Sequence, residues 1–444
     1  MARTPKRGGR EGDVASVQGV LAASAASSFD TMLLEAVARG DDSLKTGRFI
    51  VTHDPAERES AGSFMQSLGL KTADARDFDG LVADAADVGS ADTLFLPEIG
   101  VEIISAQAAA EHEAAFSAAA ADTSNPISTV EPEYFAFTSQ ISADFLLGFR
   151  CAVEALTADL APGSALRPDP LEVEAQVAGA TWGLTACKVP ASSRNGAGVR
   201  VAVLDTGMDL YHPDFAGRQI TGQTFVGQPV QDLHGHGTHC IGTSCGTLAP
   251  PASNPRYGIA HQAAILAGKV LSNSGSGATG GILAGINWAI ANQCTVISMS
   301  LGSQSPIQTA YTAAGQAALG RGCLIVAAAG NAGMPTGSPA NSPTIMAVAS
   351  LDQNLRPSSF SDFGKIDIAA PGRDVFSSAP MPQRYATMSG TSMATPHVAG
   401  CAALWAQTAQ NLRGQQLWNR LTQTARKLPL PPNRVGAGLV QAPA

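Results

Sequence analysis

Four residues able to do chemistry lie at the ends of predicted elements, in the order Asp205, His236, Asn331 and Ser392. Ser392 opens an apolar helical stretch at 390–400, where unpaired N–H groups and the positive end of the helix dipole favour an anion. Asp205 and Asn331 each follow an apolar, strand-like run, and His236 opens a short helical segment. Each residue alone is typical of a helix cap, a turn or a hydrogen-bonded core position. Together they supply the groups that acyl transfer requires.

In that chemistry Ser392 is the predicted nucleophile and His236 the general base, which later acts as the acid. Asp205 would bond the distal ring nitrogen of His236 and stabilise the imidazolium. The oxyanion would receive the side-chain N–H of Asn331 and the backbone N–H of Ser392. An α/β-hydrolase esterase is disfavoured, because that fold runs Ser, Asp, His and carries Gly-x-Ser-x-Gly, whereas residues 390–394 read Gly-Thr-Ser-Met-Ala. A binding module without catalysis is the other alternative, and the intact set of four residues disfavours it.

The blocks around these residues resemble the subtilisin family of serine peptidases. They are Val-Ala-Val-Leu-Asp-Thr-Gly at 201–207, His-Gly-His-Gly-Thr-His-Cys at 234–240, Val-Ala-Ala-Ala-Gly-Asn at 326–331 and Gly-Thr-Ser-Met-Ala-Thr-Pro-His-Val-Ala-Gly at 390–400. Shorter matches lie at 275–277, 300–302, 370–372 and 436–440, so the similarity covers about residues 181–444. The resemblance implies a serine endopeptidase with an acyl-enzyme intermediate. A general degradative enzyme and a dedicated processing peptidase share these residues.

The resemblance also implies how a peptide substrate binds. Two edge segments would bracket an extended peptide as added strands; they are Ser300, Leu301, Gly302 and Gly275, Ser276, Gly277. A pocket for the P1 side chain would be lined by small residues, namely Ala328, Ala329, Gly330 and Gly337. Such a pocket suits an apolar or aromatic P1 residue, with modest discrimination because its lining is neutral.

The chain is predicted to contain two folded domains. From residue 198 onward apolar runs alternate with helical stretches, which predicts an α/β catalytic domain over 181–444 with a mostly parallel sheet in three layers. Residues 47–139 read as strand 48–52, helix 57–68, strands 71–78 and 93–105, helix 107–120 and strand 127–137. This β-α-β-β-α-β order predicts a small ferredoxin-like α+β domain.

The domain at 47–139 resembles the inhibitory prodomain that precedes many subtilase catalytic domains. This resemblance predicts a zymogen that cuts itself once or more between about Phe137 and Thr181. Its own prodomain would act as an intramolecular inhibitor. Residues 1–46 are expected to form a poorly ordered leader. Residues 140–180 read as a helix followed by a proline-rich connector.

Metal binding is not predicted. His234, His236 and His239 suggest zinc by their spacing, but no His-Glu-x-x-His accompanies them and no fourth ligand is evident. Many subtilases hold calcium in an Asn-rich loop, whereas residues 249–257 lack those ligands. Asp214 matches a ligand position, but a single carboxylate is too little for calcium. We therefore predict no cofactor and regard calcium as doubtful.

The composition and net charge bear on which molecules the chain binds. The 444 residues are 45% hydrophobic and 14% charged, with a formal net charge of −8. This charge disfavours nucleic acid and acidic membranes as partners. The resemblance to subtilases implies polypeptide substrates. No clear secretory signal is evident, and seven cysteines do not suggest a disulfide framework, so a cytoplasmic location is favoured over secretion. Cys240, next to His239, is predicted to pack rather than to react.

Overall fold

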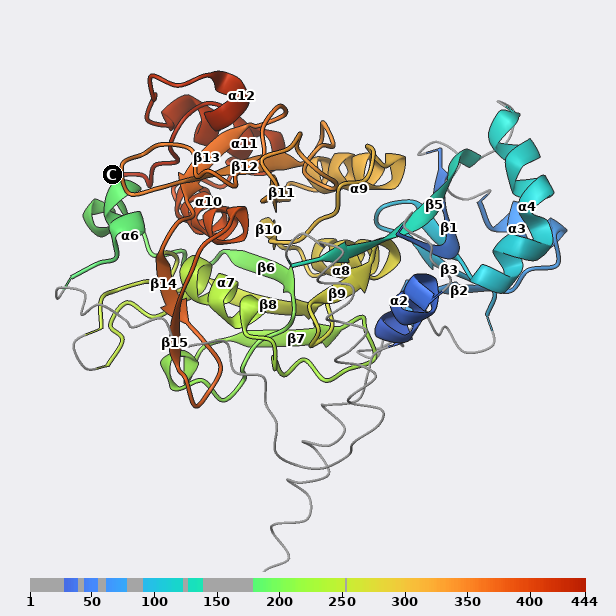
Figure 1. The fold of residues 1–444 in the computed structure, drawn as a ribbon, viewed down its shortest axis with the longest axis horizontal. Coiled ribbons are helices and arrows are strands. Elements are labelled where there is room, and N and C mark those ends of the chain that lie inside the picture. The colour runs from blue at the N-terminus through green and yellow to red at the C-terminus, as the bar shows by residue number, and fades with distance from the viewer. Residues whose placement is uncertain are drawn as a thin grey trace, which may run out of the picture.

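A computed structural model covers the 444 residues. It describes residues 28–38, 44–54, 61–77, 91–122, 127–138, 179–251 and 254–444, and the helix and connector predicted within 140–180 lie almost wholly outside them. The described residues form a larger C-terminal unit around one sheet and a smaller N-terminal unit around a second sheet (Figure 1). No helix in these ranges is long and apolar enough to cross a bilayer.

The C-terminal unit contains a seven-stranded sheet in the order β13-β12-β11-β10-β6-β8-β7, in which every neighbouring pair is parallel. The strands are β6 (Arg200–Asp205), β7 (Ile220–Thr224), β8 (Ala264–Lys269), β10 (Val296–Met299), β11 (Leu324–Ala328), β12 (Met346–Leu351) and β13 (Ile368–Pro371). The predicted parallel sheet is therefore confirmed. Strand β7 was not predicted, because it lies at the sheet edge, where a strand does not need an apolar sequence.

Helices cover both faces of this sheet. The main ones are α7 (His236–Cys245), α8 (Thr279–Ala291), α9 (Thr309–Gly320), α10 (Thr391–Ala406) and α11 (Gly414–Thr424), with the short α6 (Trp182–Ala186) and α12 (Pro432–Val435). Along β6, Val201 and Val203 pack into the core that contains α7 and α10, whereas Ala202 and Leu204 pack into the core with α8 and α9. This alternation explains why the central strands are apolar throughout. A hairpin of β14 (Val375–Ser378) and β15 (Tyr385–Met388) completes the unit.

The N-terminal unit differs from the prediction at one strand. Its elements are β1 (Lys45–His53), α3 (Ala61–Ser67), β2 (Thr72–Asp74), β3 (Thr93–Leu96), β4 (Val101–Ile104), α4 (Ala106–Ala121) and β5 (Ile127–Phe137). The single strand predicted over 93–105 is wrong: Pro97 begins a turn that ends at Gly100, so this stretch forms the hairpin β3–β4. The neighbours β5-β1-β4 keep the ferredoxin-like order, but β3 lies between β4 and β2, and β2 runs parallel to it.

The leader also differs from expectation. Residues that we expected to be poorly ordered include helix α2 (Ser28–Ala38). Phe29 and Leu33 of this helix are completely buried. Figure 1 places α2 between the two units, beside the short strand β9 (Ser276–Ala278).

Strand β5 joins the two units. At its C-terminal end Phe135 pairs with Ala278 and Phe137 pairs with Ser276, both antiparallel. Strand β9 therefore becomes the sixth strand of the N-terminal sheet although it belongs to the C-terminal unit. In Figure 1 the arrow of β5 points from the N-terminal unit into the body of the larger one.

Candidate active site

The carboxyl edge of the parallel sheet brings Asp205 and His236 together. Asp205 is the last residue of β6, and His236 is the first residue of α7. The Nδ1–H of His236 donates to Oδ1 of Asp205 over 2.8 Å, and the N–H of Thr206 donates to the same oxygen. Burial alone would lower the pKa of His236, but the Asp205 carboxylate raises it, and the net pKa lies well above the usual value of 6.5.

Asp232 fixes the start of α7. Its Oδ1 accepts the N–H groups of His234 and Gly235, and its Oδ2 accepts the N–H and the hydroxyl of Thr238. This buried carboxylate satisfies donors around the first turn of the helix that carries His236. We did not predict Asp232, although an aspartate shortly before a helix start is a usable signal for such a cap.

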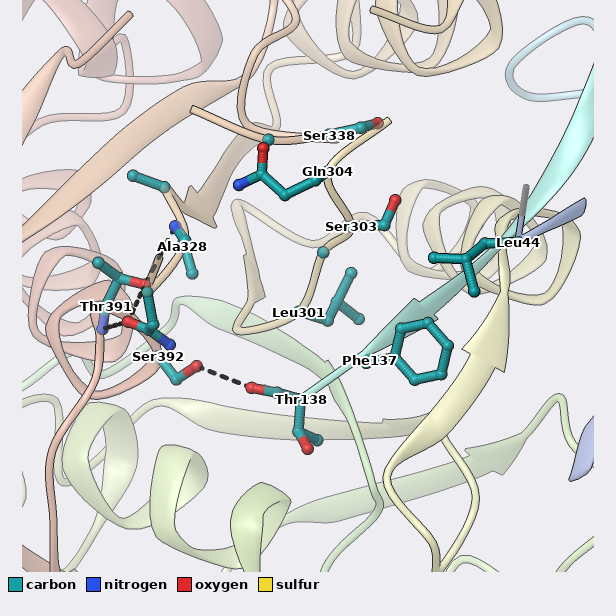
Figure 2. A pocket seen from close by; sticks show the side chains of 15 residues that line it. Leu44, Phe137, Thr138, Leu301, Ser303, Gln304, Ala328, Ser338, Thr391 and Ser392 are labelled. Atoms are coloured by element: carbon teal, nitrogen blue, oxygen red, sulfur yellow. Dashed lines mark hydrogen bonds between the residues drawn. The ribbon is translucent and has the colours of Figure 1, made fainter. Parts of the chain in front are cut away.

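Ser392 lies in the first turn of α10, directly after Gly390 and Thr391. Its Oγ lies 3.4 Å from the carbonyl oxygen of Thr138, drawn as a dashed line in Figure 2, and 3.4 Å from that of Ser300. Among the hydrogen bonds of the described ranges, none joins Ser392 Oγ to His236. The serine hydroxyl therefore faces a peptide carbonyl of the N-terminal unit.

Asn331 is oriented by Thr391. Its Oδ1 accepts the N–H of Thr391 over 2.8 Å and the hydroxyl of Thr391 over 2.9 Å. With the oxygen end held in this way, the NH₂ end of the amide is available as a donor. The loop after Asn331 is held by Asp362, whose Oδ1 accepts the N–H groups of Ala332 and Met334. No sequence pattern points to Asp362, which lies 30 residues from Ala332 in the chain.

The two edge segments bracket an extended peptide, which is part of the chain itself. The N–H of Phe137 donates to the carbonyl oxygen of Gly302 over 3.1 Å, and the N–H of Gly302 donates back over 3.0 Å. On the other side the N–H of Thr138 donates to the carbonyl oxygen of Gly275 over 3.0 Å. Ser276, Gly277 and Ala278 continue the pairing toward Phe135.

A cavity of about 100 Å³ opens beside Ser392. The predicted pocket residues Ala328, Ala329, Gly330 and Gly337 all line it, as do Leu301 and Gly302. Sequence reasoning missed Ser303, Gln304, Ser338, Thr391 and, from the N-terminal unit, Leu44 (Figure 2). Of the predicted binding residues outside its lining, Gly275, Ser276 and Gly277 pair with the peptide, and the hydroxyl of Ser300 donates to the carbonyl of Ser392 over 2.7 Å.

The histidines do not form a zinc site. The Nε2–H of His239 donates to the carbonyl oxygens of Val375 and Ala386, whereas His236 bonds Asp205, so the rings serve different partners. Burial lowers the pKa of His239 to about 3. Cys240 lies under His236, with its Sγ 3.9 Å from Nδ1, and burial raises the pKa of its thiol. A buried thiol of this kind packs rather than reacts.

Asp214 does not fit calcium. Its Oδ1 accepts the guanidinium of Arg384 over 2.8 Å, and its Oδ2 accepts the hydroxyls of Tyr257 over 2.7 Å and Tyr385 over 2.9 Å. Both oxygens therefore have donors, and a cation is already present as Arg384. A calcium ion, which needs six to eight oxygen ligands, would have to displace all three side chains.

Comparison with known proteins agrees with this geometry. Residues 196–438, more than half of the chain, match the subtilase family. The chain is 42% identical over 299 residues to an alkaline protease of Alkalihalobacillus alcalophilus, covering 66% of this chain and 76% of that protein. It is 44% identical over 270 residues to Subtilisin Savinase of Lederbergia lenta, covering 59% of this chain and 97% of that protein. A solved cold-adapted subtilisin-like serine proteinase superposes with a TM-score of 0.53 at 34% identity, covering 60% of this chain and 99% of that one.

The chain belongs to the subtilase family. It has a subtilisin-like α/β fold with a mostly parallel sheet, and it is a subtilisin-like serine protease, whose substrates are polypeptides. Catalysis in this family needs no cofactor.

The occupied Asp214 carboxylate predicts that this site does not depend on calcium. The measurements use the Ser392→Ala chain as the parent, because it should not digest itself. The change in melting temperature caused by a further Asp214→Asn substitution should be the same with and without chelator. Arg384→Gln should lower the melting temperature, because it removes the cation that faces a buried carboxylate. Differential scanning calorimetry with and without chelator measures both effects. A melting temperature that falls with chelator in this parent, but not after a further Asp214→Asn change, would show that Asp214 holds calcium.

Proposed function

We propose that the chain is a serine endopeptidase that hydrolyses peptide bonds with Asp205, His236, Ser392 and Asn331, and that it is made as a self-processing zymogen. One observation carries the proposal: a peptide strand is hydrogen-bonded in the cleft with a carbonyl oxygen 3.4 Å from Ser392 Oγ. The bond of 2.8 Å between Asp205 and His236 beside that serine supplies the rest of the mechanism.

Peptide cleavage would proceed in two steps. Ser392 Oγ attacks the carbonyl carbon while its proton passes to Nε2 of His236, and the oxyanion receives the N–H groups of Asn331 and Ser392. The C–N bond then breaks as His236 gives the proton to the leaving amine, which leaves an ester on Ser392. Water hydrolyses this ester by the same proton transfers and restores the serine. Asp205 holds Nδ1–H throughout, so that Nε2 is the free base.

We propose a preference for apolar or aromatic P1 side chains. The cavity beside Ser392 is bounded by the small residues Ala328, Ala329, Gly330 and Gly337, so a large side chain can enter it. Among the described residues no charged side chain lines this cavity, which favours burial of apolar surface over recognition of a charge.

The N-terminal unit, about residues 47–139, is proposed to be the inhibitory prodomain, with 181–444 as the catalytic domain. Besides its C-terminal end, which lies in the cleft, β5 supplies two carboxylates to the catalytic domain. Glu131 accepts the N–H groups of Thr309 and Ala310 at the start of α9, and Glu133 accepts the N–H of Gly280 at the start of α8. The residues before these two helices provide no side-chain cap. The prodomain would therefore stabilise the fold as well as cover its cleft.

Asn331→Ala should lower kcat by roughly 10²–10³ with little change in KM, because the amide matters mainly when the oxyanion forms. This range was measured partly on subtilisin itself, so it is borrowed from a relative. Steady-state kinetics on a chromogenic peptide, with Asn354→Ala on the exposed surface as the control, measures the effect. A variant that loses mainly substrate affinity would place Asn331 in binding instead.

The raised pKa of His236 predicts the acidic limb of the activity profile. The ring must be neutral to accept a proton, so kcat/KM should fall as the pH drops through a pKa above 6.5. Asp205→Asn removes the charge that raises this pKa. The limb should then move to lower pH, and activity at neutral pH should fall by roughly 10⁴. A limb that stays at the same pH in the variant would contradict the role given to Asp205.

The position of Thr138 predicts where the chain first cuts itself. The carbonyl oxygen of Thr138 lies 3.4 Å from Ser392 Oγ, so the first cut should fall after Thr138 or after Ser139. Intact-mass analysis should show loss of the preceding segment in wild-type protein and in the exposed-surface control Ser359→Ala. Ser392→Ala should stay at full length and inactive. Wild-type protein that stays intact yet fully active would refute the zymogen, although the peptidase would stand.

A further inference from the structure

Helix α2 lies over the outward side of the strand that fills the cleft. Its residues Leu33 and Ala36 form one buried apolar cluster with Phe135 and Phe137 of that strand. The backbone of the same strand is bonded to the catalytic domain at Gly302 and β9. The strand is therefore enclosed, with the catalytic domain on its hydrogen-bonding edges and α2 against its phenylalanines.

Asp30 of α2 also binds the catalytic domain directly. Its Oδ1 accepts three serine hydroxyls, those of Ser272 (2.8 Å), Ser274 (2.5 Å) and Ser276. These serines come from residues 272–276, here called the serine loop, more than 240 residues later in the chain. Asp30 is 3% exposed. A carboxylate is costly to bury unless it is hydrogen-bonded, and the serine loop provides these donors.

Phe29 extends the contact to the core around α8. Its ring is completely buried in the core that contains α8. The guanidinium of Arg48 lies 5.3 Å from the centre of this ring and pairs with Glu133, the residue that caps α8. Helix α2 thus contacts the serine loop directly and is linked through the Arg48 guanidinium to Glu133, which caps α8.

We propose that the hydroxyl groups of the serine loop are a docking site for α2, distinct from the backbone of Gly275 and Ser276 that pairs with the peptide, and that the N-terminal segment inhibits through two contacts. This proposal rests on the proposed zymogen function. The tail of β5 blocks the groove, and α2 binds through Asp30 and its apolar face. The kind of ligand that fits is an amphipathic helix with a carboxylate next to an aromatic residue, and the chain supplies it.

Two linked contacts change the timing of activation. When one contact opens, the other keeps the segment at a high effective concentration, so rebinding competes with release. After the cut near Thr138 the segment should stay bound, and activity should lag behind cleavage. Without the bond between Asp30 and the serine loop, the cleaved N-terminal segment would dissociate from the catalytic domain sooner.

The test follows self-cleavage by intact mass and activity by hydrolysis of a fluorogenic peptide, on full chains. Each activity is normalised to the same variant after complete processing. The Asp30→Asn chain should cut itself at the wild-type rate. The lag between the cut and the appearance of activity should be shorter by roughly tenfold to a hundredfold, the range expected for a lost hydrogen bond to a charged group. The control Glu113→Gln makes the same change of charge on an exposed helix position and should behave as wild type.

Ser274→Ala tests the same contact from the catalytic side, and it remains decisive even if Asp30→Asn fails to fold. It should shorten the lag in the same direction, and the double variant should release activity no faster than Asp30→Asn alone, because both changes remove one interaction. A lag equal to wild type in Ser274→Ala and in a folded Asp30→Asn would overturn the docking site and leave the zymogen intact. A wild-type chain that never cuts itself would overturn the zymogen and the docking site together.

Discussion

The antiparallel pairing of the strand at 135–138 with β9 and Gly302 is the contact on which the other features depend. It brings the Thr138 carbonyl to Ser392, and it carries Glu131 and Glu133 to the starts of two helices that have no side-chain cap of their own. It also presents the two phenylalanines against which α2 packs. Backbone pairing is indifferent to side-chain identity, so the same groove can hold first the chain's own tail and later a substrate.

The parallel sheet explains why the proposed catalytic groups meet. Asp205 ends β6, and Asn331 follows the end of β11, so both lie at the carboxyl edge where open α/β sheets collect their ligands. His236 begins the buried helix α7, and Ser392 lies in the first turn of the buried helix α10. The side chains depend in turn on groups that do no chemistry, since Asp232 anchors α7 and Thr391 turns the Asn331 amide.

The sequence predicted those parts of the fold and site that local patterns encode. Apolar runs that end in Asp, Asn or a glycine turn predicted the parallel sheet and the helices between its strands. The same runs pointed to the four proposed catalytic residues. Contacts between distant residues were not predictable. Asp214 matches a calcium-ligand position of the resembled family, but its ion pair with Arg384, 170 residues away, has no signal in the sequence around it. Helix α2 was missed because its stability comes from burial of Phe29 and Asp30 against another unit, not from a pattern within residues 28–38.

Labelling with a fluorophosphonate probe tests the central claim most directly, because the probe reacts only with an activated and accessible serine. Wild-type protein should be sampled during maturation, with the adduct located by mass. We expect one adduct, on Ser392, found on chains that have released the N-terminal segment, and no adduct on His236→Ala. Absence of any adduct after processing, or equally fast labelling of the uncut chain, would contradict it.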